Sequence, residues 1–542
     1  MNVAEALAAE LVGAGVRRVF AVMGDANMRV LVGLLDLGVD VVFARNESNA
    51  VAMADGYARV AGTLGVCSVT AGPGLVLAAL PLVTASRRAS PLLLIAGDAA
   101  ERDHGNIHRF DERRFVQGLD LSLQSVLAAE SAVADLRFAL DTALSERTAV
   151  TLRVPYDLQD APTPTPTGSS PLGDAGWRPS FVPVPQDLAA AAEQLTGARH
   201  PVVLAGRGAA DDQAGPELER FALALGAPVF TTLPARGVVD ENEPWALGIS
   251  GGYASEEGMA VLAQADVVLV VGASLSPFTT VGRTLFPNAA IVRIDARPPR
   301  PSRVAPGAAV QLQGTARVTL SALTEAVLAR LPAPRAAYVK AGSHASTPEP
   351  MAGRLLNPAY LLHAADKVIS DDAVVVIGVG HYSSFAVEQL RPARRRFVFT
   401  HEFGAIGQGL PIAIGAAAAA VGPVVLVEGD ASLMMCVQEL DTAVRAGLAL
   451  RVIVVDDEAI GAEYHKLRAE GMDGASAILP TPDLAALAQA LGADGALARD
   501  PDELEDGLQK LNAASGTFVL DGRVSRDVVS NLYRRRHQRL GS

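Results

Sequence analysis

The chain has 542 residues, of which half are apolar and 19% are charged, and its formal net charge is −13. This length exceeds one hydrophobic core and favours roughly three domains of about 150 residues each. The excess of acids argues against nucleic acid or an anionic membrane surface as a partner.

The first segment, MNVAEALAAELVGAGV, predicts an amphipathic helix that contains Glu5 and Glu10. A signal peptide would not carry these acids. The two cysteines, Cys67 and Cys436, lie in apolar segments, which is typical of buried thiols in a reducing compartment. We therefore expect a cytoplasmic protein.

Apolar β-branched runs alternate with helical patterns along the chain, which predicts an α/β fold of three consecutive doubly wound parallel-sheet domains. Two proline-rich segments, 161–184 and 332–351, predict linkers. The resulting domains are 1–160, 185–331 and 352–535, with a tail at 536–542. The predicted strands are Val66–Thr70, Leu92–Ala96, Val202–Ala205, Val267–Val271, Ile291–Ile294, Val374–Ile377, Val424–Val427 and Val452–Val455.

The stretch 409–427 carries no charge over about the length of a membrane span. Pro411, Pro423 and several glycines interrupt it, so we predict a small-residue helix over Ile412–Ala420 followed by a buried strand. The sequence thus favours a soluble protein.

Glycine-containing turns follow three of the predicted strands, in TAGPG (70–74), GHYSS (380–384) and EGDAS (428–432). The carboxyl ends of parallel strands are where α/β sheets bind ligands, and main-chain N–H groups at such turns hold phosphates. Asp430 can then bind a divalent cation against the phosphate. A helix is predicted over 434–447, immediately after this turn.

A second acidic turn follows the next strand, where RVIVV runs into Asp456, Asp457 and Glu458. Asp457 stands 27 positions after Asp430 (457 − 430). Two adjacent strand ends would bring oxygen ligands together, which predicts a Mg²⁺ site completed by phosphate oxygens.

These motifs together resemble those of the thiamine-diphosphate-dependent enzymes of the acetolactate synthase and 2-oxo-acid decarboxylase superfamily. The resemblance rests on RNESNAVAMADGYAR (45–59), AGPG (71–74) and GDAS followed by a paired acid at the family's spacing. It covers essentially the whole chain. It implies a pyrimidine-binding first domain, a Rossmann-like central domain and a diphosphate- and metal-binding third domain, with thiamine diphosphate and Mg²⁺ as cofactors.

Glu47 matches the family's catalytic glutamate, which bonds to N1′ of the aminopyrimidine so that the 4′-imino group can remove the C2 proton. A carboxyl group in an apolar pocket has a raised pKa and can share that proton. The alternative is an acid that only complements the macrodipole of the helix that follows. Family members bind the cofactor between two subunits, which implies a homodimer or homotetramer.

The resemblance also implies a set of cofactor and metal contacts. Ile406 falls at the position of the apolar residue that props the cofactor in its bent form. The implied metal ligands are Asp430, Asp457 and the main chain of Ala459. The implied cofactor contacts are Glu47, Gly72, Pro73, Gly380, His381, Tyr382, Ile406, Gly429, Asp430, Ala431, Ser432, Asp457 and Ile460.

Three residues depart from the family pattern. Asn46 replaces the usual histidine beside the glutamate, Ala431 replaces a glycine, and Asp457 replaces a metal-binding asparagine. The last change adds negative charge beside a diphosphate, which should weaken cofactor affinity unless a cation compensates.

Four further residues are candidates for proton transfer to an enamine intermediate. The resemblance implies them: GDAN (24–27), which contains Asp25, resembles the G-D-x-N segment of pyruvate-decarboxylase-like enzymes, and Glu463, six residues after Asp457 (463 − 457), matches an active-site glutamate of the same enzymes. His104 and His108 follow the strand LLLIAGD, where those enzymes place a histidine pair, although the spacing here is not the same. The alternatives are a helix cap for Asp25 and an exposed loop for the histidines.

The predicted function is decarboxylation of a 2-oxo acid to a cofactor-bound enamine, which then adds to a second carbonyl, as in acetolactate synthases. Release of an aldehyde and cleavage of an acyloin (2-hydroxy ketone) are alternatives with the same chemistry, and a non-catalytic nucleotide- or partner-binding relative is an alternative of another class. The central segment GRGAAD (206–211) lacks the nicotinamide-binding spacing. Acetolactate synthases bind FAD in this domain and related decarboxylases do not, so FAD is possible but not supported.

Overall fold

The structure, a computed structural model, describes residues 1–166, 180–282, 284–297, 307–341, 348–351, 355–391 and 395–540, with the side chains of 536–540 left out. Three six-stranded sheets follow one another along the chain, and every strand pairing in them is parallel. We name the domains N-terminal, central and C-terminal after these sheets. Parts of both predicted linkers and residues 541–542 of the tail lie outside the described residues.

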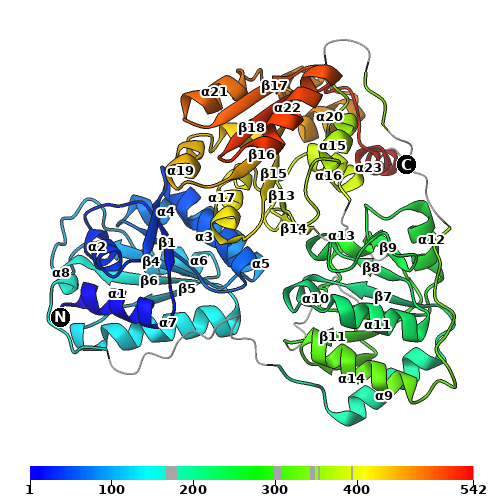
Figure 1. The fold of residues 1–542 in the computed structure, drawn as a ribbon. Helices are drawn as coiled ribbons and strands as arrows, with labels where there is room; N and C mark the ends of the chain where they lie inside the picture. Colours follow the sequence, from blue (N-terminus) through cyan, green and yellow to red (C-terminus); the bar gives the residue numbers. More distant parts are fainter. Residues whose placement is uncertain are drawn as a thin grey trace.

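The N-terminal sheet has the order β2-β1-β3-β4-β6-β5, so that the chain starts near one edge and crosses over to build both sides. Helices cover both of its faces (Figure 1). Its strands are β1 (Arg18–Ala21), β2 (Asp40–Phe43), β3 (Gly65–Val69), β4 (Leu92–Asp98), β5 (Ser122–Ser125) and β6 (Ala149–Pro155). Its helices are α1 (Val3–Gly13), α2 (Met28–Asp36), α3 (Glu47–Ala61), α4 (Pro73–Leu77), α5 (Ala79–Arg88), α6 (Glu112–Gly118), α7 (Ala132–Glu146) and α8 (Tyr156–Gln159).

The central sheet has the order β12-β11-β10-β7-β8-β9. Its strands are β7 (Pro201–Ala205), β8 (Val229–Thr231), β9 (Ala246–Ile249), β10 (Val267–Val271), β11 (Ala290–Asp295) and β12 (Val310–Gln313). Its helices are α9 (Pro185–Gly197), α10 (Arg207–Asp211), α11 (Gly215–Leu225), α12 (Glu256–Gln264), α13 (Pro277–Thr280) and α14 (Ala316–Leu328).

The C-terminal sheet has the order β14-β13-β15-β16-β18-β17, which places β15 and β16 side by side. Its strands are β13 (Val374–Ile377), β14 (Arg396–Phe399), β15 (Val424–Gly429), β16 (Leu450–Asp456), β17 (Asp494–Ala498) and β18 (Phe518–Arg523). Its helices are α15 (Pro358–Asp366), α16 (Tyr382–Gln389), α17 (Gly409–Ala419), α18 (Asp430–Met434), α19 (Glu439–Arg445), α20 (Gly461–Ala469), α21 (Leu484–Ala490), α22 (Pro501–Ala513) and α23 (Asn531–Leu540).

The predicted α/β class and all eight predicted strands are confirmed. The helix predicted over 434–447 is wrong as one element, because the chain forms α18 and α19 with a break between them. Cys67 and Cys436 are both buried and free, as expected.

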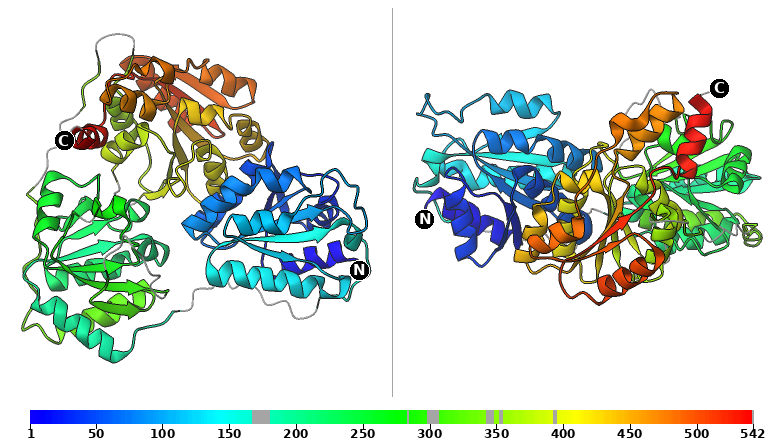
Figure 2. Two further views of the ribbon diagram at one scale, coloured as in Figure 1. Left: turned by 180° about the vertical axis from the view of Figure 1, so that it is seen from behind. Right: turned by 90° about the horizontal axis from the view of Figure 1, so that it is seen from above.

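The N-terminal and C-terminal domains meet where α3 packs against α17 (Figures 1 and 2). The approach is so close that a Cβ at Gly56 would strike the main-chain oxygen of Ile412, and one at Gly415 would strike that of Met53. Glycine is therefore required on both helices. The charge-free stretch at 409–427 is a buried helix and strand, and none of the described helices is long and apolar enough to cross a membrane.

Candidate active site

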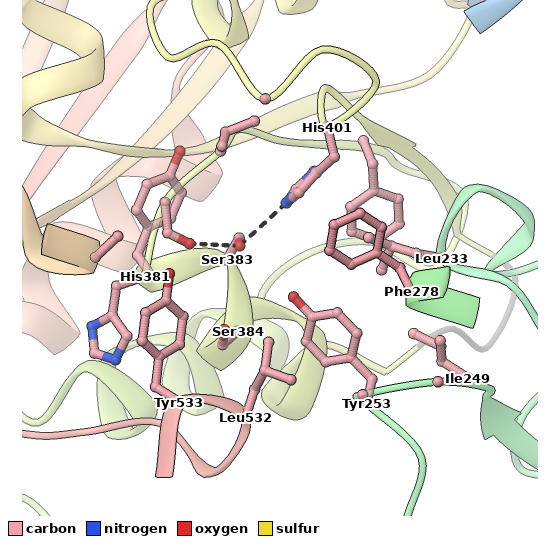
Figure 3. A pocket seen from close by; sticks show the side chains of 18 of the residues that line it. Leu233, Ile249, Tyr253, Phe278, His381, Ser383, Ser384, His401, Leu532 and Tyr533 are labelled. Atoms are coloured by element: carbon pink, nitrogen blue, oxygen red, sulfur yellow. Dashed lines mark hydrogen bonds between the residues drawn. The ribbon is translucent and has the colours of Figure 1, made fainter. Parts of the chain in front are cut away.

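A cavity of about 1210 Å³ lies between the central and C-terminal domains. The carboxyl ends of β13, β15 and β16 open into it, and so do turns after β9 and β10 of the central sheet. Figure 3 shows Tyr253 and Phe278 entering from the central domain, and Leu532 and Tyr533 from α23. Of the expected cofactor and catalytic residues, those that line the cavity are Gly380, His381, Tyr382, Ile406, Gly429, Asp430, Ala431, Ser432, Asp457, Ile460 and Glu463, together with the expected metal-site residue Ala459.

The turn that carries Asp430 is shaped by glycines. A Cβ at Gly429 would lie 2.7 Å from the ring of Tyr382, and one at Gly380 would also meet that ring, so neither position has room for a side chain. The Tyr382 hydroxyl donates to the buried carboxyl group of Glu428 beneath the turn. This packing leaves main-chain atoms on the cavity side, where they can approach a phosphate.

Asp430 and Asp457 stand at the ends of the paired strands β15 and β16. Burial raises the pKa of Asp430 to about 6, against hydrogen bonds from Thr481 and the main chain, and burial together with the charge of Asp430 raises the pKa of Asp457 to about 7. Two neighbouring buried carboxyl groups with raised pKa values are suited to bind a cation, because its positive charge would stabilise their ionised forms.

The described residues contain no group of three or more His, Cys, Asp or Glu side chains that could hold a metal. Mg²⁺ is usually held by one or two carboxylates, with phosphate oxygens and water completing its octahedron. The two aspartates and the glycine-lined turn fit that arrangement. The Thr481 hydroxyl donates to Asp430 at 2.8 Å and orients it, a contact that no sequence motif signalled.

Two arginines from the end of β18 and the following turn offset the acids around Asp457. Arg523 lies 3.1 Å from Glu458 and 3.3 Å from Asp456, and Arg526 lies 3.0 Å from Glu458. Neither forms an ion pair with the carboxylate of Asp457. The charge of Arg526 nevertheless acts to lower the pKa of Asp457, and the weaker cofactor affinity expected from this carboxylate stays a prediction.

Asp457→Asn is expected to leave metal binding intact and to tighten cofactor binding, because the amide keeps an oxygen ligand and loses the negative charge beside the diphosphate. Calorimetric titration of thiamine diphosphate at saturating Mg²⁺ measures the change. A dissociation constant that is equal to or weaker than that of the wild type would contradict this expectation.

The loop that carries Ile406 is tied to the Asp430 turn. The Ser432 hydroxyl accepts a hydrogen bond of 2.8 Å from the N–H of Gly407, whose φ of +83° favours glycine. Ile406 faces the cavity from this loop. Its place near Ser432 agrees with a supporting role, which stays a prediction.

His381 lines the cavity, and its ring packs against two other rings. Its ring lies 4.2 Å from that of His465 and 4.7 Å from that of Tyr533, and its Nε2 accepts from the N–H of Ser530. Farther along the wall, the Ser383 hydroxyl lies 3.3 Å from His401 (Figure 3). His465 and Tyr533 come from α20 and α23 and were not identified from the sequence, because no spacing links them to His381.

The other half of the expected site lies in the N-terminal domain. Glu47 is the first residue of α3, and Asn46 caps this helix by accepting from the N–H of Ser48 at 2.9 Å. The asparagine in place of the family's histidine is therefore a helix cap. Asp25 is exposed and its side chain does not cap α2, which begins after Asn27.

The turn at Gly72 and Pro73 packs against the loop of the candidate histidines. Gly72 has a φ of +62°, and a Cβ there would lie 2.6 Å from the main-chain oxygen of His108. Thr70 fills the space beside Gly24 and bonds weakly to Asp25 at 3.4 Å. These contacts bring the GDAN and TAGPG turns and His108 together, whereas His104 is exposed.

The structure does not bring the two halves together within one chain. Glu47, Asp25, Gly72, Pro73, His104 and His108 are not among the residues that line the cavity at Asp430. Glu463 is exposed in the first turn of α20 and does line it.

A buried acid begins α6, shortly after the loop of His104 and His108. Glu112 is only 4% exposed, and it lies near Asp98 with Arg153 at 3.3 Å. Burial, followed by the charge of Asp98, raises the pKa of Glu112 to about 8. Arg153 also pairs with Asp98 at the end of β4.

Glu112→Gln is expected to flatten the dependence of stability on pH. Between the reference pKa of 4.5 and the folded value of about 8, the native state holds the Glu112 proton more tightly than the unfolded chain does. The stability that Glu112 contributes through this proton is fully present below about pH 4.5 and is lost as pH rises through about 8. In thermal unfolding experiments, the Tm of the variant relative to the Tm of the wild type should therefore rise between about pH 5 and about pH 9. A constant difference in Tm would contradict this.

Several named proteins are similar to this chain over nearly its whole length and nearly their own. Acetolactate synthase isozyme 2 large subunit of Escherichia coli is 28% identical, over 98% of this chain and 97% of its own. A protein named probable 2-ketoarginine decarboxylase from Pseudomonas aeruginosa is 30% identical, over 96% and 94%. Acetolactate synthase isozyme 3 large subunit of E. coli is 28% identical, over 94% and 91%.

Three family models match consecutive parts of the chain. They are the N-terminal TPP binding domain at residues 1–122, the central domain at 188–323 and the C-terminal TPP binding domain at 378–521, each of the thiamine pyrophosphate enzymes. The two flanking matches contain Glu47 and the pair Asp430 and Asp457. The chain belongs to the thiamine pyrophosphate (thiamine diphosphate) enzymes of the acetolactate synthase-like superfamily.

Proposed function

We propose that the protein uses thiamine diphosphate and Mg²⁺ to decarboxylate a 2-oxo acid and to join the remaining fragment to a second carbonyl compound. The observation that carries this proposal is the pairing of Asp430 and Asp457 at the mouth of a glycine-lined turn. Similarity to two acetolactate synthases over nearly the whole chain supports the ligation step.

The chemistry supplied by bound thiamine diphosphate is a nucleophilic carbon and an electron sink for the loss of CO₂. In this proposal Asp430, Asp457 and the main chain of Ala459 bind Mg²⁺, and Glu47 holds a proton at N1′ of the pyrimidine. Ile406 would support the cofactor from the cavity wall. Glu463, which lines the cavity, would deliver a proton to product.

We propose further that each site is completed by a second copy of the chain. Glu47 lies outside the cavity of its own chain, although its role requires contact with the cofactor. Exposed apolar side chains flank both halves: Met434, Met435 and Ile460 beside the Asp430 turn, and Met23, Met28 and Ile107 in the N-terminal domain. Such apolar surface is typical of protein interfaces, which supports a homodimer or a homotetramer built from it.

A simple decarboxylase that releases an aldehyde is the second candidate. It is supported by the relative named as a 2-ketoarginine decarboxylase and by Glu463, a potential proton donor that lines the cavity.

Incubation with pyruvate and a panel of 2-oxo acids, with and without a second aldehyde or ketone, separates these candidates. Released CO₂ is measured and products are identified by mass spectrometry. Ligation predicts a product with the mass of both substrates less CO₂, whereas simple decarboxylation predicts an aldehyde in equal amount to CO₂. Failure to release CO₂ from any acid, with cofactor bound, would contradict both.

A further inference from the structure

The segment that carries Glu47 is held by a buried carboxylate of the C-terminal domain. Glu439, the first residue of α19, accepts hydrogen bonds from the main-chain N–H of Arg45 at 3.1 and 3.2 Å and from the Asn49 amide at 2.9 Å. Oε2, the oxygen that lies 3.2 Å from the Arg45 nitrogen, also accepts from the Thr442 hydroxyl at 2.7 Å. Glu439 is fully buried, and its donors lie on both sides of Glu47 in the chain.

The position of Glu439 is favourable for a buried charge. It lies at the N-terminus of α3, where the helix macrodipole stabilises an anion. It has donors for both of its oxygens, without which its burial would be costly. Glu439 therefore holds the beginning of α3 in a defined position relative to the C-terminal domain.

A second and more exposed layer surrounds this contact. Arg45 pairs with Asp441 at 2.7 Å, and Arg445 pairs with Asp441 at 2.8 Å and donates to the main-chain oxygen of Phe43. Exposed pairs of this kind contribute little to stability. Asp441 therefore provides a matched control on the same helix, two residues from Glu439.

We propose that Glu439 is a positioning residue, which fixes the start of α3 so that the Glu47 carboxylate meets the cofactor pyrimidine in a productive geometry. This inference rests on the proposed role of Glu47. A displacement of about 1 Å can cost on the order of 10²-fold in rate. Removing the acceptor of Arg45 and Asn49 frees the residues on either side of Glu47 to move by that amount.

The experiment compares Glu439→Ala, Glu439→Gln and Asp441→Asn in the full-length protein loaded with thiamine diphosphate and Mg²⁺. The first readout is the rate at which the C2 proton of the bound cofactor exchanges with deuterium, which reports Glu47 before any substrate is added. The second is amide hydrogen exchange of residues 45–49 in the protein without cofactor. Cofactor affinity, kcat and KM complete the set.

Glu439→Ala is expected to slow C2 exchange and kcat on the order of 10²-fold, with KM for the 2-oxo acid nearly unchanged and faster amide exchange at 45–49. Glu439→Gln should recover most of the rate, because its amide oxygen still accepts from Arg45 and Asn49. Asp441→Asn should stay within about threefold of the wild type.

A folded Glu439→Ala protein that binds cofactor and exchanges the C2 proton at the wild-type rate would overturn the inference. If that variant does not fold, the same comparison is made with Glu439→Gln and Asn49→Ala, and slower exchange in Asn49→Ala is then expected. Failure of the proposed function has a different signature, since the wild type itself would then not bind the cofactor or accelerate C2 exchange.

Discussion

Replacing Glu47 with glutamine is expected to abolish turnover while the fold is preserved. The glutamine side chain has the same shape but cannot share a proton with N1′ of the pyrimidine, and loss of a general acid–base group typically costs 10²- to 10⁴-fold, here on the order of 10³-fold. Glu47 is the first residue of α3 in the N-terminal domain and does not line the cavity at Asp430. The substitution should therefore leave the diphosphate site unaffected.

Steady-state kinetics and C2 proton exchange measure this effect, and thermal unfolding checks the fold. Asn46→Ser is the matched control, since serine also caps helices and leaves the carboxylate in place. A Glu47→Gln enzyme with activity near that of the wild type would remove Glu47 from the mechanism.

Asp430→Asn is expected to produce the second large effect, the loss of stabilisation by cofactor and Mg²⁺. A ligand present at 100 times its dissociation constant stabilises the folded state by about 2.7 kcal/mol, and this gain should disappear when the charged metal ligand is removed. The protein without cofactor should instead become more stable, because Asp430 is a buried acid, and because its charge adds to the burial of Asp457 in raising the pKa of Asp457 to about 7.

Thermal unfolding with and without thiamine diphosphate and Mg²⁺ separates these two opposite changes. Asp527→Asn, at an exposed aspartate that pairs with Arg468, is the control and should respond like the wild type. A cofactor-induced rise in Tm of wild-type size in Asp430→Asn would exclude Asp430 as the metal ligand.

The sequence predicted those parts of the site that depend on neighbouring strand ends. Asp430 and Asp457 each follow a β-branched apolar run, and consecutive strands of a parallel sheet often pair, as β15 and β16 do. The motif at a strand-to-helix junction predicts Glu47 as a site residue, and this stays a prediction; the structure shows that Asn46 caps that helix.

Contacts between distant segments could not be predicted in this way. Thr481 donates to Asp430 although the two residues are 51 positions apart, and the ring of His381 packs against that of His465 from another helix. Hydrophobic periodicity does not indicate contacts of this kind. The division of 434–447 into α18 and α19 was also missed, and it places Glu439 at a helix start that faces Arg45.

If Asp430 of one chain and Glu47 of another form one site, as proposed, two inactive variants should restore activity when they assemble together. Glu47→Gln and Asp430→Asn chains, tagged differently, are unfolded and refolded together so that mixed assemblies form. Random assembly gives about one quarter of sites with both residues intact, so about a quarter of wild-type activity is expected. Mixed assemblies that are isolated through both tags and show no activity would exclude a site shared between two chains.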